Sequence, residues 1–382
     1  MFNKPKNYYK AMAVMVGYII GVGMFGLPYL INKAGILTFF IFVIILGFAQ
    51  HLLHLIYANL ILVTKGYHRL PGYVGMYLGK DGKRLVFIAK MIGNYGALLA
   101  YIIITGIFLH QLLSPYFGGS EFLYATILFA LEATVIYFGI GMIARLELFM
   151  TGLLLLAVIL IAWRGWEAID INHYNLVDWK YFLLPYGAML FAFDGSGSLP
   201  IVSKLLKRNR KAIKSVVRAG TFLPIAVIIV FTIVIVGISS NQTTPDALTG
   251  AGRVLNNGVI IFALLFGILS MITSFLGVAE SVRETLWWDY KFNKNFAWAL
   301  AVFVPYMLYV LGLKDLINVI SFAGAIAGGL CAIMLILVFR KMKKQKNKLV
   351  LFKYKPGNFI TYLLISLFVC GMLYEIYKFA VS

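Results

Sequence analysis

The chain has 382 residues, of which 62% are hydrophobic and only 13% are charged, and its formal net charge is +20. A soluble domain carries about 25% charged residues, so the composition excludes a water-soluble globular protein. Several apolar runs exceed the ~18 residues that mark a membrane span. The sequence therefore predicts an all-α integral membrane protein with a single transmembrane domain over residues 1–382.

Apolar windows predict eleven membrane-spanning helices. Only helices and closed barrels satisfy their backbone in lipid, and these runs are too long for barrel strands. In chain order, the predicted spans are 11–34, 36–63, 85–113, 122–143, 146–164, 179–204, 217–239, 254–282, 295–312, 315–340 and 358–380.

The basic residues of the loops predict the orientation of the chain. Alternate loops of an eleven-helix path carry 27 Lys and Arg on one side and 6 on the other. Because basic loops stay inside, the N-terminus is expected in the cytoplasm and the C-terminus outside a plasma (inner cell) membrane. The basic surplus is thereby assigned to topology and to contact with lipid headgroups, and a nucleic-acid partner is not expected.

Two predicted spans carry glycines and a proline at the same relative depth. Residues 21–28 read GVGMFGLP, and residues 190–200 read LFAFDGSGSLP. Aligning Pro28 with Pro200 gives an offset of 172 residues and also matches Gly23 with Gly195. Glycine and proline are poor helix formers, so both helices are expected to break inside the membrane. Close helix packing through small residues is the alternative explanation for either cluster alone.

The two clusters open two halves that enter the membrane from opposite sides, which is typical of inverted-repeat transporters. The predicted repeats cover about residues 11–164 and 179–340, with an extra helix at about 358–380. Free N–H groups at a helix break suit a carboxylate, and free carbonyls suit an ammonium group or a cation. A zwitterionic amino acid needs both.

Four motifs resemble known amino acid permeases. Residues 21–28, with Ala34 and Gly35, resemble the first helix of the amino acid–polyamine–cation superfamily, and residues 191–195 resemble its sixth helix. The motif TSFLGV at 273–278 and the motif LPGYVGMYLG at 70–79 resemble tryptophan/tyrosine permeases. The resemblance implies a LeuT-type fold of five plus five inverted helices, extended here to eleven.

The predicted substrate site lies at the two helix breaks. Backbone N–H groups around Gly21–Gly23 are expected to bind a carboxylate, and carbonyls around Phe191–Asp194 an amine. The residues assigned to substrate binding are Gly21, Val22, Gly23, Phe25, Tyr101, Phe191, Ala192, Phe193 and Asp194. The aromatic members favour a large hydrophobic or aromatic neutral substrate, and Asp194 leaves a cationic amino acid open.

Two carboxylates inside predicted spans are candidates for proton coupling. Ionisable groups in a membrane are costly and functional by default. Asp194 lies in the second break, where it could pair with an ammonium group, coordinate a cation, carry a proton or merely cap a helix end. Glu132 lies in the fourth predicted span, where a proton relay and a protonated packing group are equal alternatives.

A sodium site is the alternative source of coupling. Hydroxyls on one helical face, opposite carbonyls of the first break, would supply hard oxygen ligands. The candidate ligands are Gly17, Ile20, Ser270, Thr273 and Ser274. Bonding of these hydroxyls back to their own helix is the simpler explanation. In some proton-coupled members of the superfamily that this chain resembles, a lysine of the fifth helix fills this site. The fifth predicted span here has no lysine, which favours Na⁺, whereas the likeness to aromatic permeases favours H⁺.

These features predict a secondary active transporter that moves an amino acid by alternating access, with H⁺ or Na⁺ as coupling ion and no cofactor. An uncoupled facilitator or channel would share the topology. A metal-dependent membrane enzyme would need more than His51 and His54, the two histidines three residues apart in the second span. No nucleophile–base pair or nucleotide-binding motif accompanies them, so the chain is not expected to be an enzyme.

Overall fold

The computed structural model describes residues 5–66, 68–138, 143–255, 258–345, 349–352 and 356–381. Parts of two predicted spans, 139–142 and 256–257, lie outside the described residues, as do four basic residues of the loop after residue 343. The α-helices of the described part are α1 (Tyr8–Ile19), α2 (Gly23–Ala34), α3 (Ile36–Val63), α4 (Leu70–Phe117), α5 (Glu121–Phe138), α6 (Ile143–Gly165), α7 (Tyr186–Ala192), α8 (Leu199–Leu205), α9 (Arg210–Ser239), α10 (Leu248–Leu255), α11 (Gly258–Glu284), α12 (Lys294–Val310), α13 (Leu316–Phe322), α14 (Gly329–Lys343) and α15 (Asn358–Val381).

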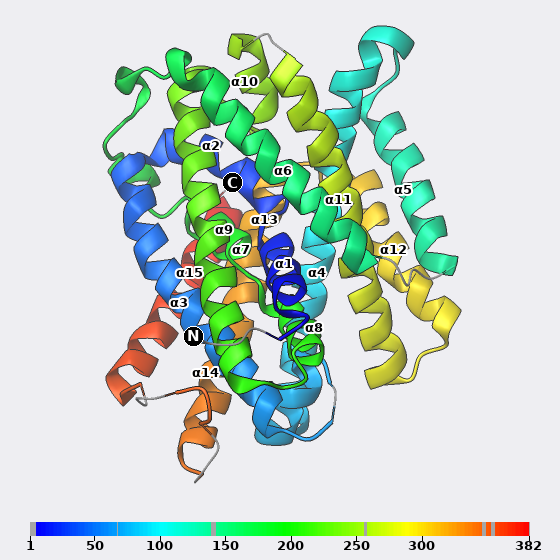
Figure 1. Ribbon diagram of the computed structural model, residues 1–382, viewed down its shortest axis with the longest axis vertical. Helices are drawn as coiled ribbons and strands as arrows, with labels where there is room; N and C mark the ends of the chain where they lie inside the picture. Colours follow the sequence, from blue (N-terminus) through cyan, green and yellow to red (C-terminus); the bar gives the residue numbers. More distant parts are fainter. Residues whose placement is uncertain are drawn as a thin grey trace.

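The helices form one bundle, in which α10 lies at the top of Figure 1 and α8 and α14 lie toward the bottom. No strand occurs in the described ranges, which confirms the all-α prediction for them. In the part of the chain that the structure describes, seven helices are long and apolar enough to cross a membrane, and α1 with α2 makes an eighth as a bent pair. The count of eleven spans stays a prediction.

Both predicted helix breaks are present. The first span is interrupted between Ile19 and Gly23, where α1 and α2 meet at 47°. The sixth is interrupted between Ala192 and Leu199 and holds only a short 3₁₀ turn there, Ser196–Ser198. The glycines and prolines at these positions explain both interruptions, because they lower the helix propensity of the span.

Two elements differ from the predicted spans. Helix α4 begins at Leu70, well before the predicted start at 85, and bends at Gly79, which has a φ of 78°. Its first ten residues, 70–79, are rich in glycine, and the charged residues Lys80, Asp81, Lys83 and Arg84 separate them from the apolar run, so an apolar window does not include them. The predicted span 315–340 is divided into α13 and α14 by a π-helical segment, Ala323–Gly328, labelled η7. Such π segments inside helices frequently mark functional positions.

The core places α7 against α13 and η7, and α1 against α9. A Cβ atom added to Gly324 would overlap the carbonyl oxygen of Gly187, and one added to Gly187 would overlap that of Ser321. The first half of the broken sixth helix therefore lies in backbone contact with the π segment. This contact fixes the position of the second break.

We expect Gly324→Ala to lower the free energy of unfolding by about 1–3 kcal/mol, because the added methyl group overlaps backbone that cannot rotate away. Gly277→Ala in α11 is the matched control, since an added Cβ there meets nothing within 4 Å. Thermal unfolding of the detergent-solubilised variants would measure both. Equal melting temperatures would contradict the close contact.

Candidate substrate-binding site

A cavity of about 80 Å³ lies where the two helix breaks meet α4 and the π segment. Seven residues assigned to the substrate from the sequence line it: Gly21, Val22, Gly23, Tyr101, Phe191, Ala192 and Asp194. The π segment contributes small residues to the opposite wall, among them Ala323 and Gly324. The structure therefore brings the two glycine clusters to one place, although they lie 172 residues apart.

Two aromatic residues assigned to the same site do not line this cavity. Phe25 is buried and packs edge-on against Phe108 and Phe231, with ring centroids 5.3 Å and 5.6 Å away. Phe193 is fully buried. Phe191 is the phenylalanine of the second break that reaches the cavity.

Glycine at the breaks allows the half-helices to touch. A Cβ atom on Gly23 would lie 2.8 Å from the Cα atom of Ala192. The start of α2 therefore meets the end of α7 in direct backbone contact. The first N–H groups of a helix and its last carbonyls lack partners within the helix. Donors and acceptors for a zwitterion are thus adjacent.

The carboxylate of Asp194 is held by its own broken segment. Oδ1 accepts the backbone N–H of Ser196 at 2.9 Å, and Oδ2 accepts the Ser196 hydroxyl at 3.1 Å. The side chain remains 33% exposed and lines the cavity. It is therefore oriented toward the cavity and still able to accept a further donor.

His54 of α3 forms one hydrogen bond with the second break and another with α9. Its Nε2 accepts the backbone N–H of Gly195 at 3.0 Å, and its Nδ1 lies 2.9 Å from the hydroxyl of Thr221. The Thr221 hydroxyl donates its own proton to the carbonyl of Val217. His54 must then donate from Nδ1, which makes it a neutral imidazole. Its 3.9 Å approach to Asp194 is consequently not an ion pair.

Lys90 is the site residue that sequence reasoning missed. Its ammonium group donates to the Ser196 hydroxyl at 2.9 Å and lies 3.6 Å from Oδ2 of Asp194. Lys90 lies inside a predicted span, apart from the basic loops that set the topology. A buried cation in that position was the available signal.

The coupling candidates lie in three different environments. Glu132 is buried in α5 and makes no hydrogen bond or ion pair with another described residue. Thr273 donates its hydroxyl proton to the carbonyl of Ser270, and Ser274 lines a second cavity. The last backbone hydrogen bond of α1 runs from the Ile20 N–H to the Val16 carbonyl. The carbonyls of Gly17 to Ile20 lie beyond this bond, at the end of the helix, where carbonyls lack partners within the helix.

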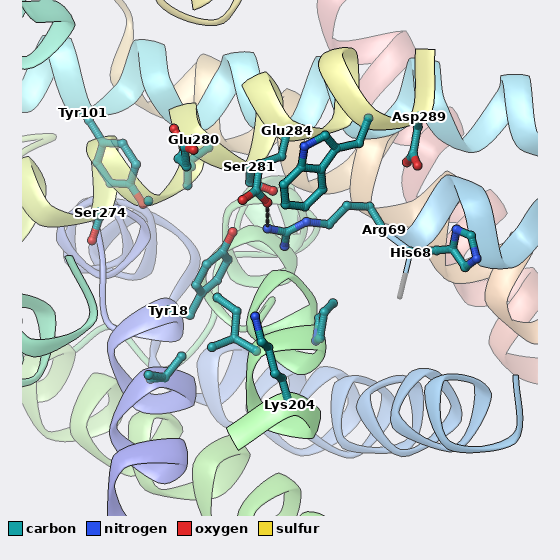
Figure 2. Close-up of a pocket in the computed structure, with 16 residues that line it drawn as sticks. Tyr18, His68, Arg69, Tyr101, Lys204, Ser274, Glu280, Ser281, Glu284 and Asp289 are labelled. Atoms are coloured by element: carbon teal, nitrogen blue, oxygen red, sulfur yellow. Dashed lines mark hydrogen bonds and ion pairs between the residues drawn. The ribbon is translucent and has the colours of Figure 1, made fainter. Parts of the chain in front are cut away.

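The second cavity is a vestibule of about 310 Å³ that adjoins the first and shares Tyr18, Tyr101 and Val278 with it. Figure 2 shows Tyr101 and Ser274 at one end and His68 and Asp289 at the other. Between them Arg69 pairs with Glu284, at an N···O distance of 2.6 Å.

A second ion pair lies beside the vestibule. Glu280 and Arg283 pair at 2.6 Å, as neighbours along one helix. Arg283 also donates to the Ile136 carbonyl of α5. Arg69 and Glu284, in contrast, link two separate segments across the vestibule.

The paired histidines do not converge on a metal. His51 packs against Phe222 with the two rings tilted by 42° and their centroids 5.0 Å apart, while His54 is turned toward Gly195. Within the described ranges, no group of three or more His, Cys, Asp or Glu side chains could hold a metal ion.

The fold is shared with a solved crystal structure. The crystal structure of MhsT in complex with L-phenylalanine matches 99% of this chain and 99% of its own, with a TM-score of 0.69 and 13% sequence identity. Together with the two broken helices, this match shows the LeuT-type fold.

The particular family follows from the sequence profile. The Tryptophan/tyrosine permease family matches residues 4–375, so the chain belongs to it. A curated relative, "Tyrosine-specific transport system 1" of Haemophilus influenzae, is 24% identical over 388 aligned residues, which cover 96% of this chain and 95% of the relative. The resemblance to amino acid permeases inferred from short motifs is confirmed.

We expect His54→Ala to lower the free energy of unfolding by about 1–3 kcal/mol, because it leaves the Gly195 N–H without an acceptor and removes the hydrogen bond to the Thr221 hydroxyl. His51→Ala is the matched control, since the Nδ1 atom of His51 has no hydrogen-bond partner in the described structure. Thermal unfolding in detergent would compare them. A larger loss for His51→Ala would contradict the assigned support.

Proposed function

We propose that the protein carries a large neutral amino acid, aromatic in its best substrates, across the plasma membrane by alternating access. One observation carries the proposal: the two broken helices and the carboxylate of Asp194 meet at a single cavity. Backbone N–H groups around Gly21–Gly23, at the first break, bind the substrate carboxylate. Asp194 and the carbonyls at the end of α7 bind its ammonium group.

The family and the two similar proteins support an aromatic side chain. One relative is named for tyrosine, and the similar crystal structure contains L-phenylalanine. In this chain, Tyr101 and Phe191 supply aromatic surface beside the backbone groups that bind the zwitterion. An aromatic substrate can stack on or pack edge-on against such rings.

The arrangement of the cavities supports alternating access. The vestibule lies at the end of the bundle that the basic loops predict to be cytoplasmic. It meets the 80 Å³ cavity between the two helix breaks, the central cavity, at Tyr18 and Tyr101. In the proposed cycle the substrate leaves the central cavity through this vestibule. The N-terminus is cytoplasmic and the C-terminus extracytoplasmic in the same proposal.

The driving force in this proposal is a gradient of H⁺ or of Na⁺. Proton coupling would use Asp194 or Glu132, two carboxylates within the membrane. Sodium coupling would use the carbonyls after Val16 with Thr273 and Ser274, which are oxygen ligands of the kind Na⁺ prefers. An uncoupled facilitator is the alternative, with the same site and no accumulation.

Uptake into proteoliposomes tests the function directly. We expect radiolabelled tyrosine, tryptophan or phenylalanine to accumulate when an inward Na⁺ or H⁺ gradient is imposed, each gradient separately. Vesicles without protein and vesicles treated with an ionophore are the controls. Equilibration without accumulation would establish the facilitator, and no entry of any amino acid would overturn the transport proposal.

Asp194→Asn tests the ammonium site. We expect substrate affinity to fall about tenfold or more, because a hydrogen bond to a charged group contributes about 1.5–3 kcal/mol. Asp315→Asn is the control: Asp315 caps the start of α13 by accepting the Asn318 N–H, and asparagine caps equally well. Equilibrium binding of a labelled aromatic amino acid would measure the difference. Wild-type affinity in Asp194→Asn would show that the amine binds elsewhere.

A further inference from the structure

The central cavity contains one cationic side chain that the proposed binding scheme does not use. Among the described residues that line it, Lys90 is the only cation and Asp194 the only anion. Both are largely buried, with side-chain exposures of 19% and 33%. Removing two charges from water is costly unless they neutralise each other. Lys90 therefore balances the charge of the site when no substrate is bound.

The contact between the two groups is loose. The Lys90 ammonium lies 3.6 Å from Oδ2 of Asp194, whereas direct charge-assisted bonds are about 2.7–2.9 Å long. Its hydrogen bond goes instead to the Ser196 hydroxyl, which in turn donates to Asp194. The two charges thus neutralise each other through space, and the Ser196 hydroxyl bridges them. A ligand that binds Asp194 has no direct hydrogen bond between the two groups to break.

No other described side chain can take the place of Lys90 on Asp194. The nearest alternative, His54, has its Nε2 occupied as an acceptor of the Gly195 N–H and cannot donate from it. The remaining bonds to the carboxylate come from Ser196. Asp194 therefore has two sources of positive charge, Lys90 and a ligand.

We propose that Lys90 is a tethered ammonium group that occupies Asp194 in the empty permease and is displaced by the α-ammonium group of the substrate. The inference deepens the proposed function and rests on it. The volume of the cavity agrees with it, because about 80 Å³ is far below the roughly 300–1,000 Å³ of ligand pockets. An aromatic amino acid requires the cavity to expand, and movement of the long Lys90 side chain creates space next to Asp194.

Displacement makes the amino group a condition of binding. A ligand with an ammonium group replaces the charge that Lys90 withdraws, so Asp194 stays neutralised. A carboxylic acid without an amino group cannot do so, and Lys90 stays in place. The site would then select amines over isosteric acids through a competitor built into the protein.

Binding to Lys90→Gln tests the competition with two half-substrates. Tyramine carries the ammonium group alone, and 3-(4-hydroxyphenyl)propionate carries the carboxylate alone. We expect the variant to bind tyramine about tenfold tighter or more, because the positive charge that competes for Asp194 at close range has been removed, and the acid with unchanged affinity. Equilibrium binding to the purified full-length protein would measure both. Lys83→Gln, on the same helix and outside the cavity, should match wild type.

The opposite pattern would overturn the proposal. If Lys90→Gln weakened binding of the acid and left tyramine unchanged, Lys90 would bind the substrate carboxylate. Unchanged affinity for both ligands would also overturn it, by showing that Lys90 does not compete. Wild-type protein that binds no aromatic amino acid would instead overturn the proposed function, and the inference with it.

Loss of Lys90 leaves a buried carboxylate without a counter-ion, so the single variant could fail to fold. The double variant Asp194→Asn/Lys90→Gln avoids this, because it has neither buried charge, and it is compared with Asp194→Asn. For tyrosine and for the acid, we expect the two variants to have the same affinity as each other, since Lys90 acts only through Asp194. Weaker binding by the double variant would overturn the proposal. Size-exclusion chromatography would verify folding.

Discussion

The structure depends on one constraint: backbone groups released at two helix breaks have no water to bind inside a membrane. The side chains of α3 satisfy part of this need at the second break. His54 accepts the N–H of Gly195, and Gln50 donates to the carbonyl of Leu190 at 3.2 Å. Asp194 satisfies the N–H of Ser196. The second span carries polar residues in an otherwise apolar run because its neighbour is broken, and the groups that remain free at the cavity are available to a zwitterion.

Much of the fold could be predicted from the sequence because helices in lipid need long apolar runs. The glycine and proline spacing also located both breaks, since it acts locally on helix propensity. The start of α4 could not be predicted in this way, because its glycine-rich residues 70–79 are separated from the apolar run by Lys80, Asp81, Lys83 and Arg84 and resemble a loop in composition. These residues lie in a helix that extends beyond the apolar part of the span.

The residues that line the site were harder to predict from the sequence than the fold, because their positions depend on three-dimensional geometry. Phe25 and Phe193 were assigned to it because they neighbour the glycines, but successive residues of a helix point in different directions, and both are buried away from the cavity. The pairing of Arg69 with Glu284 joins residues 215 positions apart, and nothing local predicts it. Lys90 was visible as a charge inside a span, yet its partner became apparent only once α4 was placed against the second break.

The two cavities meet at residues from different parts of the bundle. Tyr18 comes from the half-helix α1, whereas Tyr101 comes from the continuous helix α4. A break next to α1 lets this half-helix shift without α2, while α4 remains held by α5, α11 and α12. In the proposed cycle, the boundary between cavity and vestibule is made by one element that the glycines make movable and one that packing holds in place. The residues that expose backbone groups for a ligand would then also allow the passage beside them to change width, so that the proposal gives binding and movement a single physical origin.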